Sequence, residues 1–329
     1  MTGMSRKTSW LIFALLLAAL LVLPFFFKNY RVFQFNLVII YAVAILGLNI
    51  LTGFNGQISL GHGAFYAIGA YTAAILMDHG GMPYWATLPI AGVICFGFGF
   101  LMGFPALRLA GHYLALATFA FALAVPQLLK YKLIEGYTGG VQGIVLNKPK
   151  PPFEFRLFDQ PLSADRWLYI CSLLVAALMF VLAWNLLRGR IGRALIAIRD
   201  HPIAATAMGI NLPMIKSTTF GVSAAYTGVA GALGGICVAF VAPDSFPVFL
   251  SITLLVGVVV GGLASISGAI FGAIFIQFIP NIADDISKSA PWAIYGAVLI
   301  GLMYLMPGGV MGLLKTLWHR FRPRAAARG

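Results

Sequence analysis

Long apolar runs recur along this chain and are separated only by short polar gaps. A helix that crosses a bilayer needs about 20 mostly apolar residues, and such a series of runs predicts about ten membrane spans. The runs are Ser9–Phe27, Phe35–Thr52, Ala64–Met77, Tyr84–Phe104, Tyr113–Leu129, Trp167–Leu187, Thr218–Val241, Val248–Leu263, Ile266–Ile282 and Trp292–Val310.

The first run follows Arg6 and Lys7, as the apolar part of a signal peptide would. Its apolar core is long, and no small-x-small cleavage site precedes Lys28. We therefore predict that the run is a retained first helix.

The composition excludes a soluble globular protein. Hydrophobic residues make up 60% of the 329 residues and charged residues only 9%, whereas soluble domains are about 25% charged. We predict an all-α integral membrane protein that forms a single transmembrane domain over residues 1–329. The three cysteines, Cys95, Cys171 and Cys237, lie inside apolar runs without metal-ligand spacing, so we expect no disulfide framework, no metal site and no cofactor.

The basic residues predict how the chain is oriented. The net charge of +13 comes mainly from short gaps between runs, which indicates membrane orientation rather than nucleic-acid binding. Positively charged segments stay in the cytoplasm, and three of them agree on cytoplasmic N- and C-termini. These segments are Arg6–Lys7, the loop 188–216 and the tail 315–329, which we expect to contact lipid of the inner leaflet. The nearly balanced, proline-containing loop 131–165 is then external.

The predicted spans carry no acidic or basic residue near their centres. An ionisable residue inside a membrane usually marks a proton relay or a voltage sensor. Its absence disfavours proton-coupled and voltage-gated mechanisms, and indicates that any energy source acts elsewhere.

A glycine-rich polar segment, Asn49–Gly69, interrupts the apolar pattern between the second and third runs. Irregular backbone at membrane depth is tolerated only where it is buried in protein or lines a cavity. One interpretation is a broken helix at a translocation pathway, and the other is a cytoplasmic turn with close glycine packing. The pathway candidates are Asn49, Asn55, Gln57, Ser59 and His62. Of these we expect His62 to be a hydrogen-bonded structural residue.

A second interruption, from Gly257 to Gly272, breaks the late apolar region. Interrupted segments at matching places in two halves are typical of an inverted internal repeat. Close helix packing through small residues is the alternative, and we favour it for most of these glycines.

The loop 188–216 is both basic and amphipathic, and predicts two short helices on the cytoplasmic face. Pro202 begins the second helix, Asp200 is available as its cap and Gly209 ends it. The loop either rests on anionic headgroups or docks a cytoplasmic partner.

Three stretches, in this order along the chain, resemble the permeases of branched-chain amino acid ABC transporters. They are NILTGFNGQISLGHGAFYAIGAY from Asn49, GRALIAIRD from Gly192 with AATAMGIN following, and VVVGGLASISGAIFGA from Val258. The chain looks like the longer, M-type subunit. It departs from many importer permeases at Ile203, where they place Glu before the Ala-Ala pair.

The resemblance implies an importer in the bacterial inner membrane, with substrate delivered by a periplasmic binding protein. A second homologous permease subunit would complete the pathway, and two cytoplasmic ATP-binding subunits would drive it. The chain has no GxxxxGK[ST] motif, which fits a transport subunit that is not itself an enzyme. The resemblance also implies that the loop 188–216 is the coupling loop, which would contact the ATPase through Arg193, Arg199, Asp200, Ala204, Ala205 and Gly209.

Two rival functions stay open at this point. A urea or short-amide importer permease belongs to the same wider family, and the motifs do not separate it from an amino acid permease. An ungated channel is the more remote alternative, since broken segments also build selectivity filters.

Overall fold

The computed structural model describes residues 15, 17–108, 111–153, 156–157, 160–288 and 290–321. Helices dominate the described chain, and their order follows the apolar runs. The helices are η1 (Leu23–Phe26), α2 (Asn29–Asn49), the π-helix η2 (Ile50–Phe54), α3 (His62–Asp78), α4 (Tyr84–Arg108), α5 (His112–Leu129), α6 (Glu135–Thr138), α7 (Ala164–Arg188), α8 (Arg190–Asp200), α9 (Pro202–Ala207), α10 (Leu212–Val238), η3 (Pro243–Ser245), α11 (Val248–Gly261), α12 (Gly268–Ile286), α13 (Pro291–Leu305) and α14 (Gly309–Phe321). The strands are β1 (Ile144–Val145), β2 (Arg156–Leu157), β3 (Gln160–Pro161) and β4 (Phe240–Val241).

The structure confirms an all-α integral membrane protein. Within the described residues, 8 helices are long and apolar enough to cross a membrane. The predicted third span is the 17-residue helix α3. The predicted first span, Ser9–Phe27, lies partly outside the described residues, and within them Leu17–Phe26 forms a shorter apolar helix. The count of about ten therefore stays a prediction.

The late apolar region forms two separate helices, α11 and α12, as predicted. The linker between them begins at Gly262, which has φ +114°, and contains Ala264 at φ +55°. Both values lie in the left-handed region, which a helix cannot continue through. Each predicted interruption is thus a real break in helical structure, while the inverted repeat stays a prediction.

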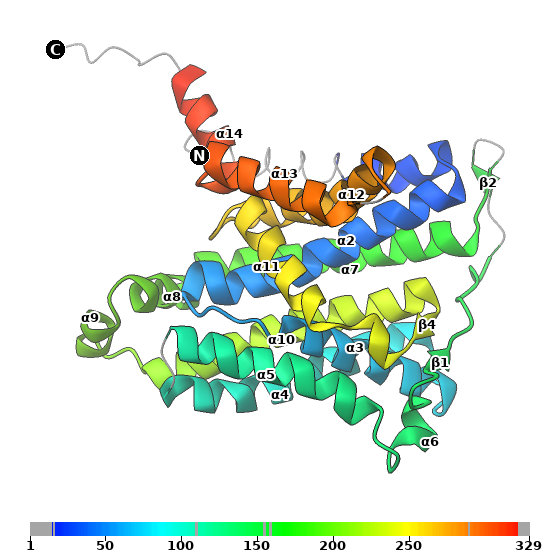
Figure 1. Ribbon diagram of the computed structural model, residues 1–329, viewed down its shortest axis with the longest axis horizontal. Helices are drawn as coiled ribbons and strands as arrows, with labels where there is room; N and C mark the ends of the chain where they lie inside the picture. Colours follow the sequence, from blue (N-terminus) through cyan, green and yellow to red (C-terminus); the bar gives the residue numbers. More distant parts are fainter. Residues whose placement is uncertain are drawn as a thin grey trace.

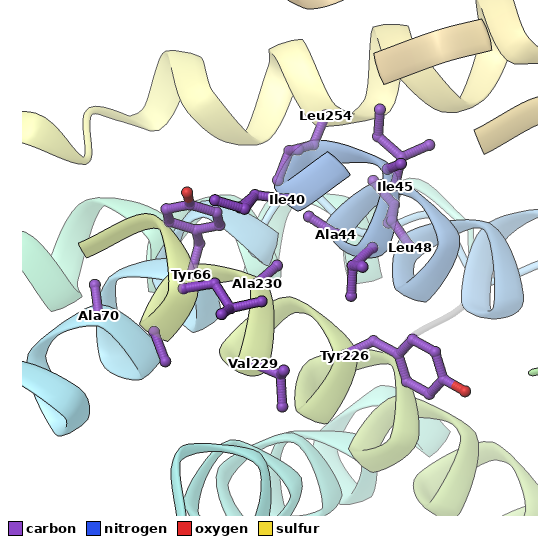
Figure 2. Close-up of a cluster of buried hydrophobic side chains, with 14 of the residues drawn as sticks. Ile40, Ala44, Ile45, Leu48, Tyr66, Ala70, Tyr226, Val229, Ala230 and Leu254 are labelled. Atoms are coloured by element: carbon purple, nitrogen blue, oxygen red, sulfur yellow. The ribbon is translucent and has the colours of Figure 1, made fainter. Parts of the chain in front are cut away.

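Helix α10 lies at the centre of the bundle and packs against α2, α3 and α4 (Figure 1). Helix α2 in turn packs against α7, α11 and α12. Figure 2 shows the cluster where these elements meet, with Ile40 and Leu48 of α2, Tyr66 of α3, Ala230 of α10 and Leu254 of α11. Helices α2 and α10 are therefore buried on most sides, while α13 is largely exposed at the periphery.

Small residues allow this close approach. A Cβ at Gly69 of α3 would overlap the carbonyl group of Gly228 in α10, and a Cβ at Gly228 would overlap the Cys95 thiol in α4. Lipid tails are as apolar as leucine, so helices in a membrane associate through tight packing rather than through the hydrophobic effect. The glycines of α3 and α10 thus set the distance between the central helices.

The two ends of the bundle differ in structure. Helices α8 and α9 lie at one end, and α6, β1 and β4 lie at the opposite end (Figure 1). At the latter end Ile144 of β1 pairs with Val241 of β4, in antiparallel register. Two ion pairs lie at this end: Lys130, just after α5, pairs with Asp244 of η3 at 2.5 Å, and Lys148 of the long loop pairs with Asp165 in the first turn of α7 at 2.8 Å.

The loop 131–165 is largely irregular, as its prolines predict. Residues 146–153 form neither helix nor strand, although β1, β2, β3 and the short helix α6 also lie in this loop. Residues 154, 155, 158 and 159 are outside the described part of the chain. So are Arg6, Lys7 and the end of the basic tail from residue 322.

Gly69→Val tests the central packing. We expect a loss of about 1–3 kcal/mol in the free energy of unfolding, or more, because the added side chain forces α3 away from α10. Thermal unfolding followed by circular dichroism in detergent measures the effect. Gly97→Val in α4 is the matched control, because the space around a Cβ at Gly97 is open. Equal melting temperatures for both variants would contradict this packing.

Candidate functional site

The break between α2 and α3 is partly buried, with Gly56 and Ile58 exposed, and begins with an unusual turn. Helix α2 continues into the π-helix η2, and residues 56–61 are irregular before α3 begins at His62. Gly56 has φ +74°, a conformation that favours glycine. π-Helices are rare and frequently occur at functional sites. The glycine-rich segment therefore forms a real interruption of a buried helix.

Asn49 joins this break to the linker between α11 and α12. Its amide nitrogen donates to the carbonyl oxygen of Ser265 at 2.8 Å and to that of Gly262 at 3.4 Å. Its amide oxygen accepts from the backbone N–H of Ala264 at 2.9 Å. The side chain is fully buried, and both its amide nitrogen and its amide oxygen bond across the contact between the two helix breaks.

His62 belongs to a chain of directed hydrogen bonds at the start of α3. The Ser223 hydroxyl donates to the carbonyl oxygen of Gly47 (2.6 Å), and so it accepts from Nε2–H of His62 (2.7 Å). Nδ1 of His62 then accepts from the hydroxyl of Ser59 (2.9 Å). Complete burial of the ring favours this neutral form over a charged imidazolium, and the imidazole links α2, α3 and α10, as expected for a structural histidine.

Two further hydroxyl groups satisfy backbone groups of the break. Thr118 of α5 accepts from the N–H of Leu60 at 2.9 Å, and Ser251 of α11 accepts from the N–H of Gly63 at 2.8 Å. The N-terminal N–H groups of a helix lack partners inside it, so such contacts are needed when the helix begins in a protein interior. Sequence reasoning missed Thr118, Ser223 and Ser251, because each lies within an ordinary apolar run.

Asn55 and Gln57 differ from the other polar candidates. Both atoms of the Asn55 amide are buried and have no hydrogen-bond partner among the described residues. The amide nitrogen of Gln57 donates to the carbonyl oxygen of Lys216 at 3.5 Å, while its oxygen has no described partner. Leaving a buried polar group unpaired costs about 1–3 kcal/mol, so each such group calls for an explanation.

The predicted coupling loop forms two short helices, α8 and α9, as expected. The buried face of α8 carries Leu195 and Ile198, and in α9 Ala205 is buried while Ala204 is exposed. Gly209, at φ +83°, follows the end of α9, and Asn211 caps α10 by accepting from the N–H of Met214. The loop is therefore folded onto the bundle and is not a loose segment.

The prediction that Asp200 caps α9 is wrong. Asp200 is the last residue of α8, and the N-cap position of α9 belongs to His201, which makes no side-chain capping bond. Pro202 supplies the helical φ at the first position without an N–H that needs a partner. The Asp200 carboxylate instead accepts from Nε of Arg199 at 2.9 Å.

Two arginines of the loop are both exposed but differ in their contacts. Arg193 is exposed on α8. Arg199 is also exposed, with 35% of its side chain accessible, but its Nη1 donates to the carbonyl oxygen of Gly53 at 3.0 Å. Within the described residues, no group of three or more His, Cys, Asp or Glu side chains is placed to hold a metal ion.

A bundle of apolar helices with a broken, polar element in its interior is typical of membrane transport proteins. Residues 30–307 match the sequence profile of the family described as branched-chain amino acid transport system / permease component. The chain belongs to this family.

The relatives differ in how closely they match. The chain is 35% identical to the high-affinity branched-chain amino acid transport system permease protein LivM of Escherichia coli K12, over 92% of this chain and 75% of LivM. Identity to LivM of Salmonella typhimurium is 34% over the same shares. Identity to the LivH permease of E. coli K12 is 23%, over 83% of this chain and 91% of LivH. No solved structure matches the chain.

Asn49→Ala tests the contact between the two helix breaks. We expect the free energy of unfolding to fall by about 1–3 kcal/mol, because buried backbone groups of the linker lose their partner. Amide exchange of residues 262–267 should accelerate at the same time. Asn281→Ala is the control, since Asn281 is exposed and bonds only within its own helix. Unchanged linker exchange in Asn49→Ala would rule out the contact.

Proposed function

We propose that this chain is the M-type permease subunit of an ABC importer for branched-chain amino acids in the bacterial inner membrane. The match to LivM over most of the chain carries this proposal, because the LivH relatives match less well. The chain would form half of the translocation pathway, and a second homologous permease subunit would form the other half. Two cytoplasmic ATP-binding subunits would supply the energy, and a periplasmic binding protein would deliver the amino acid.

The distribution of charge supports an orientation with α8 and α9 in the cytoplasm. This end carries the arginine-rich loop 188–216, and positively charged short loops are retained on the cytoplasmic side. The opposite end, with α6, β1 and β4, would then face the periplasm and the binding protein (Figure 1). Both termini of the chain are cytoplasmic in this proposal.

The exposed surface of the coupling loop supports a protein contact. Ile203 and Met208, at the two ends of α9, are 88% and 83% exposed. Exposed apolar side chains next to small residues such as Ala204 and Gly209 suit a groove on another protein. We propose that α9 occupies such a groove on the ATPase, with Arg193 at its edge.

Among the five predicted pathway residues, we propose Asn55 and Gln57 as the contacts with the substrate. Asn49, Ser59 and His62 already use their polar atoms within the chain, whereas Asn55 and Gln57 retain unpaired ones. A branched-chain amino acid is apolar except for its zwitterionic end, which needs hydrogen-bond partners on its way through the membrane. Weak contacts suffice, because the binding protein would select the substrate.

ATP-dependent uptake of leucine tests the proposed function. The chain is reconstituted in vesicles with its partner permease, the ATPase subunits and the binding protein. We expect leucine uptake that requires ATP and that isoleucine and valine compete. Uptake of urea in place of leucine would indicate an amide importer, and uptake independent of ATP would indicate a channel. Either result would overturn the proposal.

Asn55→Leu separates a pathway role from a structural one. We expect stability to be unchanged or higher, because the substitution removes an unpaired buried amide from an apolar setting. Leucine uptake should nevertheless fall, by about fivefold or more if the amide contributes one ordinary hydrogen bond to the moving substrate. Asn36→Leu is the control, since Asn36 is also buried and its amide oxygen is likewise unpaired, but its nitrogen donates to Sγ of Cys237 and it lies in the first half of α2, away from the helix break. Normal uptake by Asn55→Leu would exclude Asn55 from the pathway.

A further inference from the structure

We propose that Arg199 is the positioning residue through which the coupling loop moves the broken end of α2, and with it the linker between α11 and α12. This inference rests on the proposed function, since it concerns how ATP-driven movement of the loop reaches the pathway. The evidence is a continuous set of contacts from α8 to the two helix breaks.

The first contact joins the coupling loop to the π-helix. Nη1 of Arg199 donates to the carbonyl oxygen of Gly53 at 3.0 Å, while Nε donates to the Asp200 carboxylate at 2.9 Å. The last carbonyl groups of a helix lack partners inside it, and a cation near them is favoured by the helix dipole. Two bonds from one planar group also fix the direction of the side chain. Arg199 therefore holds the end of η2 in a defined position.

The second contact is steric. The aliphatic part of Arg199 lies directly against Gly56, where a Cβ would come within 2.9 Å of Cγ of the arginine. Gly56 follows Asn55, the residue with the unpaired amide. Arg199 thus contacts the backbone on both sides of Asn55, and a displacement of α8 is expected to displace this amide as well.

The third contact joins the end of η2 to the linker between α11 and α12. A Cβ at Gly53 would overlap both the amide oxygen of Asn49 and the backbone nitrogen of Ala264. Asn49 is itself bonded to Ala264 and Ser265. The turn that Arg199 holds is therefore packed without clearance against the linker, so the turn and the linker should move together.

The π-helix supplies the means of movement. Its hydrogen bonds span five residues instead of four, so it contains one residue more than the equivalent α-helical turn. Conversion to an α-helical turn would shift residues 53–56 and rotate Asn55 relative to α10. Arg199 is bonded to the last part of this turn, and is well placed to favour one arrangement over the other.

Arg199→Ala tests the inference in the reconstituted complex. We expect ATP hydrolysis to persist while leucine taken up per ATP falls at least about fivefold, in the range of measured coupling between sites. Arg199→Lys should recover part of the ratio, because an ammonium group can donate to the Gly53 carbonyl but lacks the planar fork. Arg190→Ala, which removes an exposed arginine at the other end of α8, should transport normally.

Amide hydrogen exchange supplies a readout that does not depend on transport. Exchange of residues 50–57 is compared with and without a non-hydrolysable ATP analogue in the purified complex. In the wild type we expect the nucleotide to change this exchange, and in Arg199→Ala we expect the change to be lost. A nucleotide response equal to that of the wild type in Arg199→Ala would overturn the inference, as would a normal uptake ratio.

The two proposals fail in different ways. If the wild-type complex does not take up leucine but residues 50–57 respond to nucleotide through Arg199, the proposed substrate is wrong and the inference stands. If the wild type takes up leucine and Arg199→Ala remains fully coupled, the inference is wrong and the proposed function stands.

Discussion

The interruption between α2 and α3 leaves backbone N–H and C=O groups outside regular helix in a partly buried segment of a membrane protein, and the buried groups need partners. The structure supplies the partners from distant parts of the chain: Thr118 for Leu60, Ser251 for Gly63, and Arg199 for the carbonyl of Gly53. Each partner lies on a different helix. The helices that surround the break are therefore held by the same bonds that make the break tolerable.

Close packing through glycine makes these bonds reachable. Gly69 and Gly228 let α3 and α10 approach until backbone meets backbone, and this brings Ser223 within 2.7 Å of His62. A hydroxyl group is short, so a separation larger by one methyl group would break the chain of bonds through the imidazole. Stability and the position of the candidate pathway residues consequently depend on the same small side chains.

Much of the architecture could be predicted from local patterns. Apolar runs predicted the spans, and the glycines between Asn49 and Gly69 predicted a real break. Capping was less predictable: Asp200 is in a suitable position to cap α9, yet its carboxylate binds Arg199 instead. Arg166 shows another limit, since it lies buried in the first turn of α7 and donates to the carbonyl oxygens of Pro24 and Pro161, outside the apolar run that predicted the helix. In such cases local and distant partners compete for the same side chain. The spacing of residues in the sequence does not show which partner it binds.

The sequence alone determined that this chain is an all-helical membrane protein with two interrupted segments and a basic amphipathic loop, because hydropathy and glycine content act locally and at fixed spacing. Only the tertiary structure decided which polar residues are already paired. Asn49 and His62 are satisfied within the chain, and Asn55 is not. It also showed that Arg199, an exposed residue of the loop, donates to the carbonyl oxygen of Gly53. These outcomes depend on residues more than one hundred positions apart meeting in space, and on the requirement that buried polar groups find partners wherever the packing brings them together.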